Sequence, residues 1–461
     1  MNIPLRRVSV TCAVLLFALL AHLTHLQAFG RRDLVADHRN ERALLARYAH
    51  PRGDILTYDG RVLATSAETG TGPYRHRRVY TGGRTYAPVT GHFSLRRATG
   101  VERAAQAVLS GTDPKIRMRA LVGDGPPAGA DVRLTIRHRV QWAAYQGLAR
   151  AGRPGAAVAI DPATGAILAL ASYPSYDPAG YTAQDAAAVE AADRALRGDP
   201  ARPLLNRALH GTYPPGPAFE VVTTAAALAS GEYTIASPIS AGAGQVAPPP
   251  SRPDGSPAGP GERPCGNGRP TLAHAFRLSC GAAFAALGAQ LGQDLLRDQA
   301  EAFGFNATDL AVPLRVAAST FPAGLDRTGT ALSAAGLHDR ATPLMIAMLS
   351  AAVANGGVAM RPYLVQEVRL PDGSIIDRAG PAPYRTAVPP ALAGQLTVLM
   401  ATATRPGLAL EGVEVAAKSS PTVVTAFAPA TAPEVAVGVV LEQGPARAAP
   451  IARAILQAAL S

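Results

Sequence analysis

Lysine is nearly absent from this chain of 461 residues, in which Lys115 and Lys418 are the only two examples. The net charge of +11 therefore comes from arginine, and no run of clustered basic residues with interleaved aromatics accompanies it. Nucleic-acid-binding surfaces usually carry such basic clusters, so we expect no nucleic-acid partner. A surface that faces anionic polymers or lipid headgroups explains the same charge.

The sequence also lacks the spacings of common cofactor sites. Asp309, Asp326 and Asp339 lie far apart, and no His or Cys spacing typical of a metal site occurs. No Gly-x-x-x-x-Gly-Lys-[Ser/Thr] phosphate-binding loop is present. We therefore predict neither a metal nor a cofactor. His210, close to Tyr213, is interpreted as a surface or packing residue rather than a general base.

Cysteine occurs only three times, which limits the possible disulfides to a single plausible pair. Cys12 lies in an apolar N-terminal stretch, so Cys265 and Cys280 alone remain to pair outside it. The sequence allows a disulfide between them, and it equally allows two free buried thiols.

One long apolar run is present, from Val8 to Phe29, and Arg6 and Arg7 precede it. A helix needs about 20 residues to cross a bilayer, so residues 1–30 are predicted to form a cytoplasmic tip and a single-pass membrane anchor. A signal peptide cleaved near Leu26-Gln27-Ala28 is the alternative. Both interpretations place the bulk of the chain outside the cytoplasm.

The chain is long enough for two or three domains, and 48% hydrophobic with 17% charged residues allows a large buried core. The turn-rich stretch Gly123–Gly129 predicts a domain boundary, which divides the chain into 31–128 and 129–461. Ser240–Gly268 is rich in Pro and Gly and predicts an exposed loop of low order. No internal repeat is visible.

Alternation of apolar residues predicts several strands. In the first domain, residues around Asp59-Gly60 predict a hairpin with a type I′ turn. In the second, strands bracket a helical region and a last helix packs back, which favours an α/β sandwich of the α+β kind. The expected strands are Val132–Ile136, Ala156–Ile160, Ala166–Ala171, Val413–Lys418, Thr425–Pro429 and Val435–Glu442, and the helices Val140–Leu148, Leu272–Ser279, Phe284–Leu291, Asp294–Phe303, Met345–Ala354 and Pro450–Leu460.

A tight turn from Tyr213 to Glu220 leads into the apolar run Val221–Leu228. Gly216 allows a sharp bend, and a Pro at a first helical position costs no hydrogen bond, so a helix is expected to begin here.

Several phrases of the sequence resemble, in the same order, the class B penicillin-binding proteins of the actinobacterial type. They include Arg-Gly-x-Ile from Arg52, the stretch Ala159–Pro178 around Asp161-Pro162, and Tyr213–Glu220, which is similar to Tyr-Pro-Pro-Gly-Ser-x-Phe-Lys. The resemblance covers nearly the whole chain. It implies a membrane-anchored protein of peptidoglycan synthesis, with a small N-terminal pedestal (dimerisation-like) domain and a penicillin-binding transpeptidase domain related to serine β-lactamases.

The chain departs from that family at its first motif, Ser-x-x-Lys. Pro217 stands at the position of the nucleophilic serine and Glu220 at that of the lysine base. Pro217 also lacks the backbone N–H that the resemblance assigns to the oxyanion hole, where one lost donor costs about 3 kcal/mol. Glu220 is interpreted as a charge that suits a helix N-terminus, with a new catalytic role as the alternative.

The second and third motifs are altered too. In Ser-x-Asn, Ser279 is kept and Gly281 replaces the asparagine, whereas Lys-Thr-Gly reads Lys418-Ser419-Ser420. Lys418 and Ser419 keep a cation and a hydroxyl, but Ser420 adds a side chain where a substrate backbone approaches the strand. The segment after it is short.

These changes predict a pseudo-transpeptidase that scaffolds or regulates cell-wall synthesis in division or cell shape and forms no covalent penicillin adduct. The resemblance implies a polytopic membrane glycosyltransferase as partner, and non-covalent binding of peptidoglycan stays open. The alternative is a residual acyl-transfer enzyme that uses Ser279 with Lys418.

Overall fold

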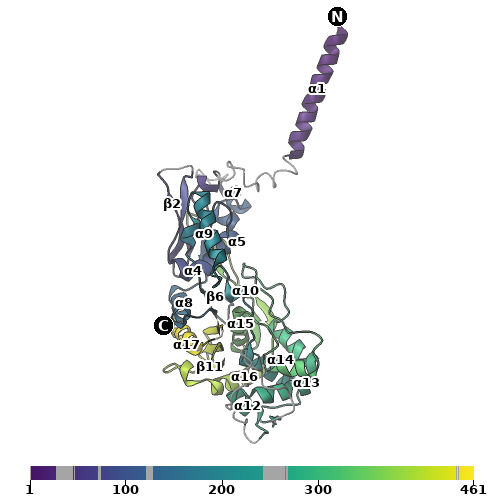
Figure 1. Cartoon of the computed structure of the whole chain (residues 1–461), viewed down its shortest axis with the longest axis vertical. Coiled ribbons are helices and arrows are strands. Elements are labelled where there is room, and N and C mark those ends of the chain that lie inside the picture. Colours follow the sequence, from purple (N-terminus) through teal and green to yellow (C-terminus); the bar gives the residue numbers. More distant parts are fainter. Residues whose placement is uncertain are drawn as a thin grey trace.

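The computed structural model describes residues 2–26, 45, 47–70, 74–120, 128–241, 265, 268–442, 444 and 446–461. Most of the predicted boundary at Gly123–Gly129 and most of the predicted loop Ser240–Gly268 lie outside the described residues. The first described element is α1 (Asn2–His25). Its segment Arg6–His25 has a mean hydropathy of 1.9, is not buried, and is long and apolar enough to cross a membrane. Figure 1 shows α1 standing apart from the rest of the chain.

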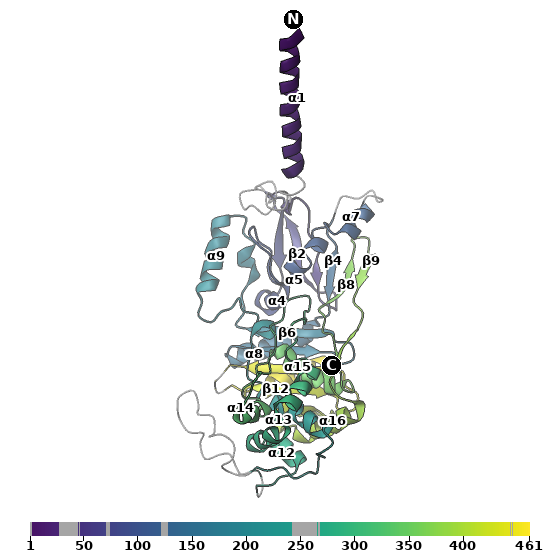
Figure 2. The same cartoon turned by 90° about the vertical axis from the view of Figure 1, so that its right-hand side faces the viewer.

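A six-stranded sheet forms the upper unit in Figure 2, which we call the pedestal. Its strand order is β3-β2-β1-β4-β8-β9, and β1 pairs in parallel with β4. Two of its strands come from much later in the chain, so the pedestal is not a single continuous segment. The strands are β1 (Ile55–Leu56), β2 (Val62–Glu68), β3 (His76–Tyr80), β4 (Asp131–Leu134), β8 (Val365–Arg369) and β9 (Ile375–Arg378).

The predicted hairpin between β1 and β2 is present, but its predicted type I′ turn is wrong. Only Gly60 has a positive φ, at 82°, whereas a type I′ turn needs positive values at both central residues. The loop is longer, and the Thr57 N–H donates to the Arg61 carbonyl oxygen at 2.9 Å.

The pedestal also contains several short helices and the longer α9, and it encloses a buried ion cluster. Glu102 accepts from Arg78 at 2.6 Å and from Arg52 at 2.9 Å, and all three side chains are almost inaccessible. Such a carboxylate is stable in the interior because both its charge and its hydrogen-bonding capacity are satisfied. The helices are α4 (Gly83–Thr90), α5 (Gly100–Ala104), α6 (Gln106–Leu109), α7 (Pro114–Ala120) and α9 (Ala186–Gly198).

The lower unit is built on a five-stranded antiparallel sheet of order β11-β12-β13-β5-β6. Nearly every residue of these strands is buried, because helices cover both faces. Alternate residues face opposite layers, so Ala157 packs with α8 and α17 while Val158 packs with the other helices. The strands are β5 (Gly155–Ile160), β6 (Ile167–Tyr173), β11 (Ala416–Ser419), β12 (Val423–Ala428) and β13 (Val435–Leu441).

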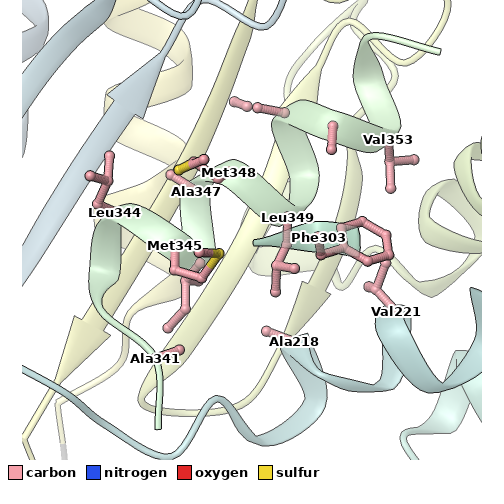
Figure 3. Packing of buried hydrophobic residues seen from close by; sticks show 14 of the residues in the cluster. Ala218, Val221, Phe303, Ala341, Leu344, Met345, Ala347, Met348, Leu349 and Val353 are labelled. Carbon is pink, nitrogen blue, oxygen red and sulfur yellow. The ribbon is translucent and has the colours of Figure 1, made fainter. Parts of the chain in front are cut away.

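Figure 1 shows α8 (His138–Ala151) and α17 (Ala449–Leu460) on one side of this sheet, and α15 (Pro343–Ala354) on the other. α15 is apolar around its whole circumference, which fits a helix enclosed by protein. In Figure 3 its side chains face Ala218 and Val221, so it supports the turn that precedes α11. The predicted α/β sandwich is confirmed by this layered arrangement.

Most of the remaining helices pack together on the α15 side of the sheet, whereas η2 packs against α4 and α9 of the pedestal and η4 packs against α17. The two helices predicted on either side of residue 292 form one element, α13, in which Gly292 has non-helical dihedrals and makes a kink. The elements are α10 (Arg207–His210), α11 (Glu220–Ala229), α12 (Leu272–Leu278), α13 (Gly281–Phe303), α14 (Arg327–Ala334), α16 (Pro390–Ala403), the short helices η2 (Pro178–Tyr181), η3 (Gly216–Ala218) and η4 (Pro406–Leu408), and the paired strands β7 (Val358–Met360) and β10 (Pro383–Thr386).

Candidate active site

The predicted turn is the single-turn helix η3, which leads through Phe219 into α11. Gly216 has φ of 50°, and its N–H donates to the Gly336 carbonyl oxygen at 2.9 Å. A Cβ on Gly336 would lie 2.2 Å from the Gly216 carbonyl oxygen, so only glycine fits there. The turn is therefore held rigidly, and it presents a half-buried Pro217 that has neither a hydroxyl nor an N–H.

Glu220 is the first residue of α11, and its side chain is 2% exposed. Burial raises the pKa of its carboxyl, while the charge of Lys418 and a hydrogen bond from Ser279 oppose the shift. The sequence interpretation placed this charge at a helix N-terminus, which is correct. It missed the main partner, which is the ammonium of Lys418.

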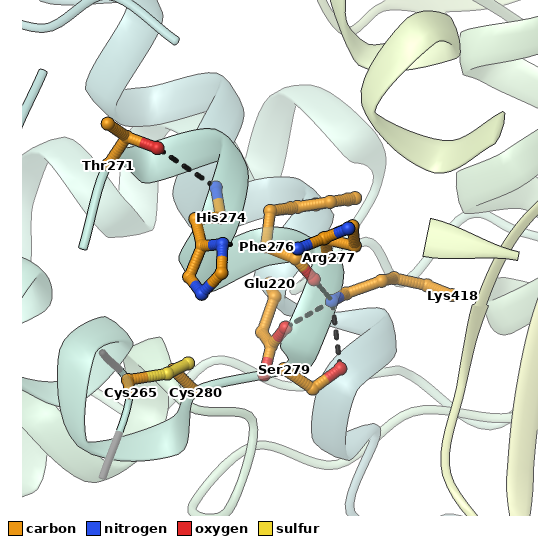
Figure 4. Close-up of a disulfide and its surroundings, with 9 residues drawn as sticks. All are labelled: Glu220, Cys265, Thr271, His274, Phe276, Arg277, Ser279, Cys280 and Lys418. Carbon is orange, nitrogen blue, oxygen red and sulfur yellow. Dashed lines mark hydrogen bonds and ion pairs between the residues drawn. A yellow bond between two sulfur atoms is a disulfide. The ribbon is translucent and has the colours of Figure 1, made fainter. Parts of the chain in front are cut away.

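Lys418 extends from β11, at the edge of the five-stranded sheet, and is 1% exposed. Its Nζ lies 2.6 Å from Glu220 Oε2 and donates to Ser279 Oγ at 2.9 Å and to the Phe276 carbonyl oxygen. Figure 4 shows these three contacts converging on one nitrogen atom. The Phe276 ring adds a cation–π contact, with Nζ 4.1 Å from its centroid.

Three oxygens around Nζ suit an ammonium, which donates in three directions and accepts in none. Burial lowers the pKa of Lys418, and the Glu220 carboxylate opposes that shift. Glu220 Oε2 accepts no well-directed hydrogen bond, so charge attraction dominates its contact with Lys418. In the ammonium form that these three oxygens favour, the nitrogen has no lone pair with which to take a proton from a nucleophile.

Ser279 ends α12 in the left-handed region, with φ of 56°, and is half-buried. Its neighbour Cys280 caps α13 and forms a disulfide with Cys265, with a Cα–Cα distance of 6.0 Å. Of the two alternatives left open by the sequence, the structure therefore contains the disulfide. Gly281 begins α13, and a Cβ placed on it would meet only open space.

Ser419 and Ser420 end β11 in a tight turn to β12. The Ser420 N–H donates to the Val423 carbonyl oxygen at 2.8 Å, and its hydroxyl accepts from the Val423 N–H at 3.0 Å. Ser419 is buried. The segment that the sequence predicted to be short is therefore a closed hairpin between β11 and β12, in which Ser420 hydrogen-bonds Val423 of the same chain.

The structure brings three of the predicted positions into direct contact, namely Glu220, Ser279 and Lys418. η3, which contains Pro217, packs beside β11 and β12, and Gly281 follows the same corner as Ser279. The Phe276 carbonyl oxygen was not foreseen, because a backbone acceptor leaves no signal in the sequence. Among the described residues no group of His, Cys, Asp or Glu could hold a metal ion.

Comparison with known proteins gives matches along the chain. A family model described as the penicillin binding protein transpeptidase domain matches residues 155–460, and one described as the penicillin binding protein A dimerisation domain matches 52–132. Peptidoglycan D,D-transpeptidase PbpA of Mycolicibacterium smegmatis is 42% identical, over 100% of this chain and 99% of that protein. Its counterpart in Mycobacterium tuberculosis is 40% identical over the same shares.

Solved structures of a penicillin-binding protein and of a transpeptidase domain are also similar to this chain. The ceftriaxone acyl-enzyme complex of penicillin-binding protein A from M. tuberculosis superposes with a TM-score of 0.84 at 38% identity, covering 90% of this chain and 100% of that one. A D,D-transpeptidase domain from Eggerthella lenta gives 0.75 at 31% identity, covering 89% and 98%.

Proposed function

Because this chain belongs to the class B penicillin-binding proteins of peptidoglycan synthesis, we propose that it is a catalytically inactive member that scaffolds or regulates cell-wall assembly. One observation carries the proposal: Lys418 Nζ is enclosed by the carboxylate of Glu220, the hydroxyl of Ser279 and the carbonyl of Phe276. An amine in this position neither activates a nucleophile nor reaches a substrate carboxylate.

The turn at Pro217 supports the same proposal from the side of the nucleophile. Covalent acyl transfer requires an activatable hydroxyl or thiol, and proline supplies none. The imino nitrogen also has no hydrogen for a developing oxyanion, and that donor alone contributes about 3 kcal/mol in other serine enzymes. Restoring the side chain of a single motif would therefore leave other catalytic parts missing.

The closed β11–β12 hairpin supports the proposal from the side of the substrate. A peptide that extends an edge strand needs free backbone groups and room beside them. Ser420 uses its hydroxyl and its N–H to hold Val423, and its side chain occupies space that glycine would leave open. Reversible binding of peptidoglycan elsewhere on the molecule is compatible with this arrangement.

In a scaffold, α1 would anchor the protein in the membrane, and α1 and the pedestal would contact the partner. We place the retained anchor in the cell membrane and the bulk of the chain outside the cytoplasm, since α1 has the length and hydropathy of a span. A polytopic membrane glycosyltransferase is the proposed partner, contacting α1 and the pedestal. Co-purification that is lost when α1 is exchanged for an unrelated span would support this partner.

Incubation with a fluorescent penicillin tests the lack of transpeptidase chemistry. We expect no label on this chain that survives denaturation, whereas penicillin-binding protein A of M. tuberculosis, which forms a penicillin G acyl-enzyme, serves as the positive control. A stable label on the purified chain would contradict the proposal.

A specific contact favours a second candidate function, an altered acyl transfer at Ser279. Its hydroxyl and the Glu220 carboxylate both contact Lys418 Nζ, at 2.9 Å and 2.6 Å, so a possible nucleophile and a possible base lie side by side. In this reaction Ser279 Oγ bonds to the lactam carbonyl carbon, the ring C–N bond breaks, and the hydroxyl proton passes through Glu220 to the leaving nitrogen. Labelling that disappears in Ser279→Ala would favour this candidate over the first.

A further inference from the structure

A cavity lies away from Lys418, where the pedestal meets the lower unit. Its volume is about 660 Å³. Figure 1 shows α4 and α5 of the pedestal approaching α10 of the lower unit at this level. Residues from both units line it, so a ligand held there would contact the pedestal and the transpeptidase-like unit together. Its lining includes Pro88, Arg103, Leu204, Asn206, Leu314 and Arg315.

Positive charge in this cavity is not neutralised by the protein. Arg103 and Arg315 are exposed, and neither guanidinium has an ion-pair partner in the part of the chain that the structure describes. No Asp or Glu is among the lining residues. Arg47 lies in an adjoining groove that shares Arg103, so the positive surface extends into that groove. Guanidinium groups without protein partners are suited to bind a carboxylate or a phosphate.

Asn206 adds a requirement for a hydrogen-bond donor on the ligand. Its Nδ2 donates to the Pro88 carbonyl oxygen at 2.8 Å, whereas its Oδ1 is buried and accepts no hydrogen bond. A buried acceptor without a donor is unfavourable unless a ligand or water satisfies it. A bare anion has no N–H for this atom, but an amide or a hydroxyl group has one.

Part of the cavity wall is apolar. Pro88, Leu204 and Leu314 offer aliphatic contact beside the two arginines. His210 also lines the cavity, but burial lowers its pKa, so the positive charge comes mainly from the two arginines. The cavity thus combines cations, one unused acceptor and apolar walls.

We propose that this cavity binds a short peptide with a free carboxylate, the chemistry of a peptidoglycan stem peptide. The inference rests on the proposed function, because a scaffold of cell-wall synthesis without a working catalytic site still benefits from holding the polymer. The peptide carboxylate contacts Arg103 and Arg315, its amide N–H donates to Asn206, and its aliphatic side chains lie on the apolar wall.

Calorimetric titration of the full chain in detergent with a disaccharide-pentapeptide from peptidoglycan tests the proposal. We expect saturable binding that weakens about tenfold in Arg103→Gln and again in Arg315→Gln, since each loses a charge-assisted hydrogen bond. Both side chains are exposed, so the variants should fold, and unchanged thermal unfolding checks this. Arg453→Gln, an exposed arginine on α17 outside the cavity, is the matched control.

Two further titrations distinguish a peptide carboxylate from other ligands. The same peptide with its carboxylates amidated should bind about tenfold more weakly, and inorganic phosphate should not compete at millimolar concentration. Absence of saturable binding, equal loss in Arg453→Gln, or equal affinity for the amidated peptide would overturn the inference. Penicillin labelling of the same preparation tests the proposed lack of catalysis separately. Peptide binding in the cavity and the lack of catalysis can therefore be refuted independently.

Discussion

Glu220 and Lys418 meet inside the protein, with Oε2 and Nζ 2.6 Å apart and both side chains at most 2% exposed. One comes from the first turn of α11 and the other from an edge strand of the sheet. Under the proposed motif assignment, Glu220 supplies a counter-charge to Lys418 at the position where the family has a base. Two of the altered motifs are coupled by this contact.

Breaking the pair from one side should destabilise the fold. Glu220→Ala leaves the Lys418 ammonium buried without a counter-charge, and we expect a loss of about 3–5 kcal/mol in the free energy of unfolding. Urea unfolding followed by circular dichroism measures it.

Removing both charges is the control. Glu220→Met combined with Lys418→Met should recover most of that loss, because an apolar pair of similar volume needs no desolvation. If the double variant is as unstable as Glu220→Ala, packing rather than charge stabilises this contact.

Asp339 predicts a pH dependence of stability. It is fully buried, and burial raises the pKa of its carboxyl to about 8, against the smaller opposing effects of Ser333 and its own backbone. The folded pKa lies above the unfolded value of about 3.9, so the folded state binds the proton more tightly. Its contribution to stability is full below about pH 4 and is lost as the pH rises to about 8.

Asp339→Asn removes this titration. Relative to the parent chain, the variant should gain stability progressively between about pH 4 and pH 8, by a few kcal/mol in total. Thermal unfolding of both chains across that range tests the sign. Parallel curves for the two proteins would show that the carboxyl does not titrate as expected.

The disulfide predicts a definite thiol count. Without reductant, the denatured full chain should expose one thiol, that of Cys12, and three after reduction. Replacing Cys265 and Cys280 by serine should cost about 3 kcal/mol, since the bridge closes a sequence separation of 15 residues. Three reactive thiols before reduction would contradict the pairing.

Penicillin labelling should be restored only when both Pro217 and Glu220 are changed. Pro217→Ser alone should remain unlabelled by fluorescent penicillin, because Lys418 stays paired with Glu220. Adding Glu220→Lys places two amines together, which lowers the pKa of one and provides a neutral base. Slow labelling is then expected, and a third change, Gly281→Asn, has room for its side chain. Labelling of the single Pro217→Ser variant would refute this dependence.

Much of the fold could be predicted from local pattern. β5, β12, β13 and α17 lie close to their predicted bounds, because buried strands and amphipathic helices leave clear periodicity. β11 begins later than predicted, since Val413 pairs instead with Leu410. The return of β8 and β9 to the pedestal could not be predicted, because strand pairing over such a separation leaves no local signal.

The altered motif positions were also visible in the sequence, but their mutual contacts were not. Glu220, Ser279 and Lys418 come from three distant segments, and only the fold brings them together. The cavity with Arg103 and Arg315 was missed because neither arginine stands out among so many. An arginine indicates an anion-binding site only once the structure shows that no acidic side chain lies beside it.

The shared pedestal sheet has a consequence for the length of chain that the pedestal needs. β4 pairs with β8 and β8 with β9, so the N-terminal sheet is completed by strands encoded in the distal half of the gene. Truncation after residue 128 would strip β4, β8 and β9 from that sheet and expose the edge of β1. The pedestal sheet can therefore be complete only in a chain that extends at least through Arg378.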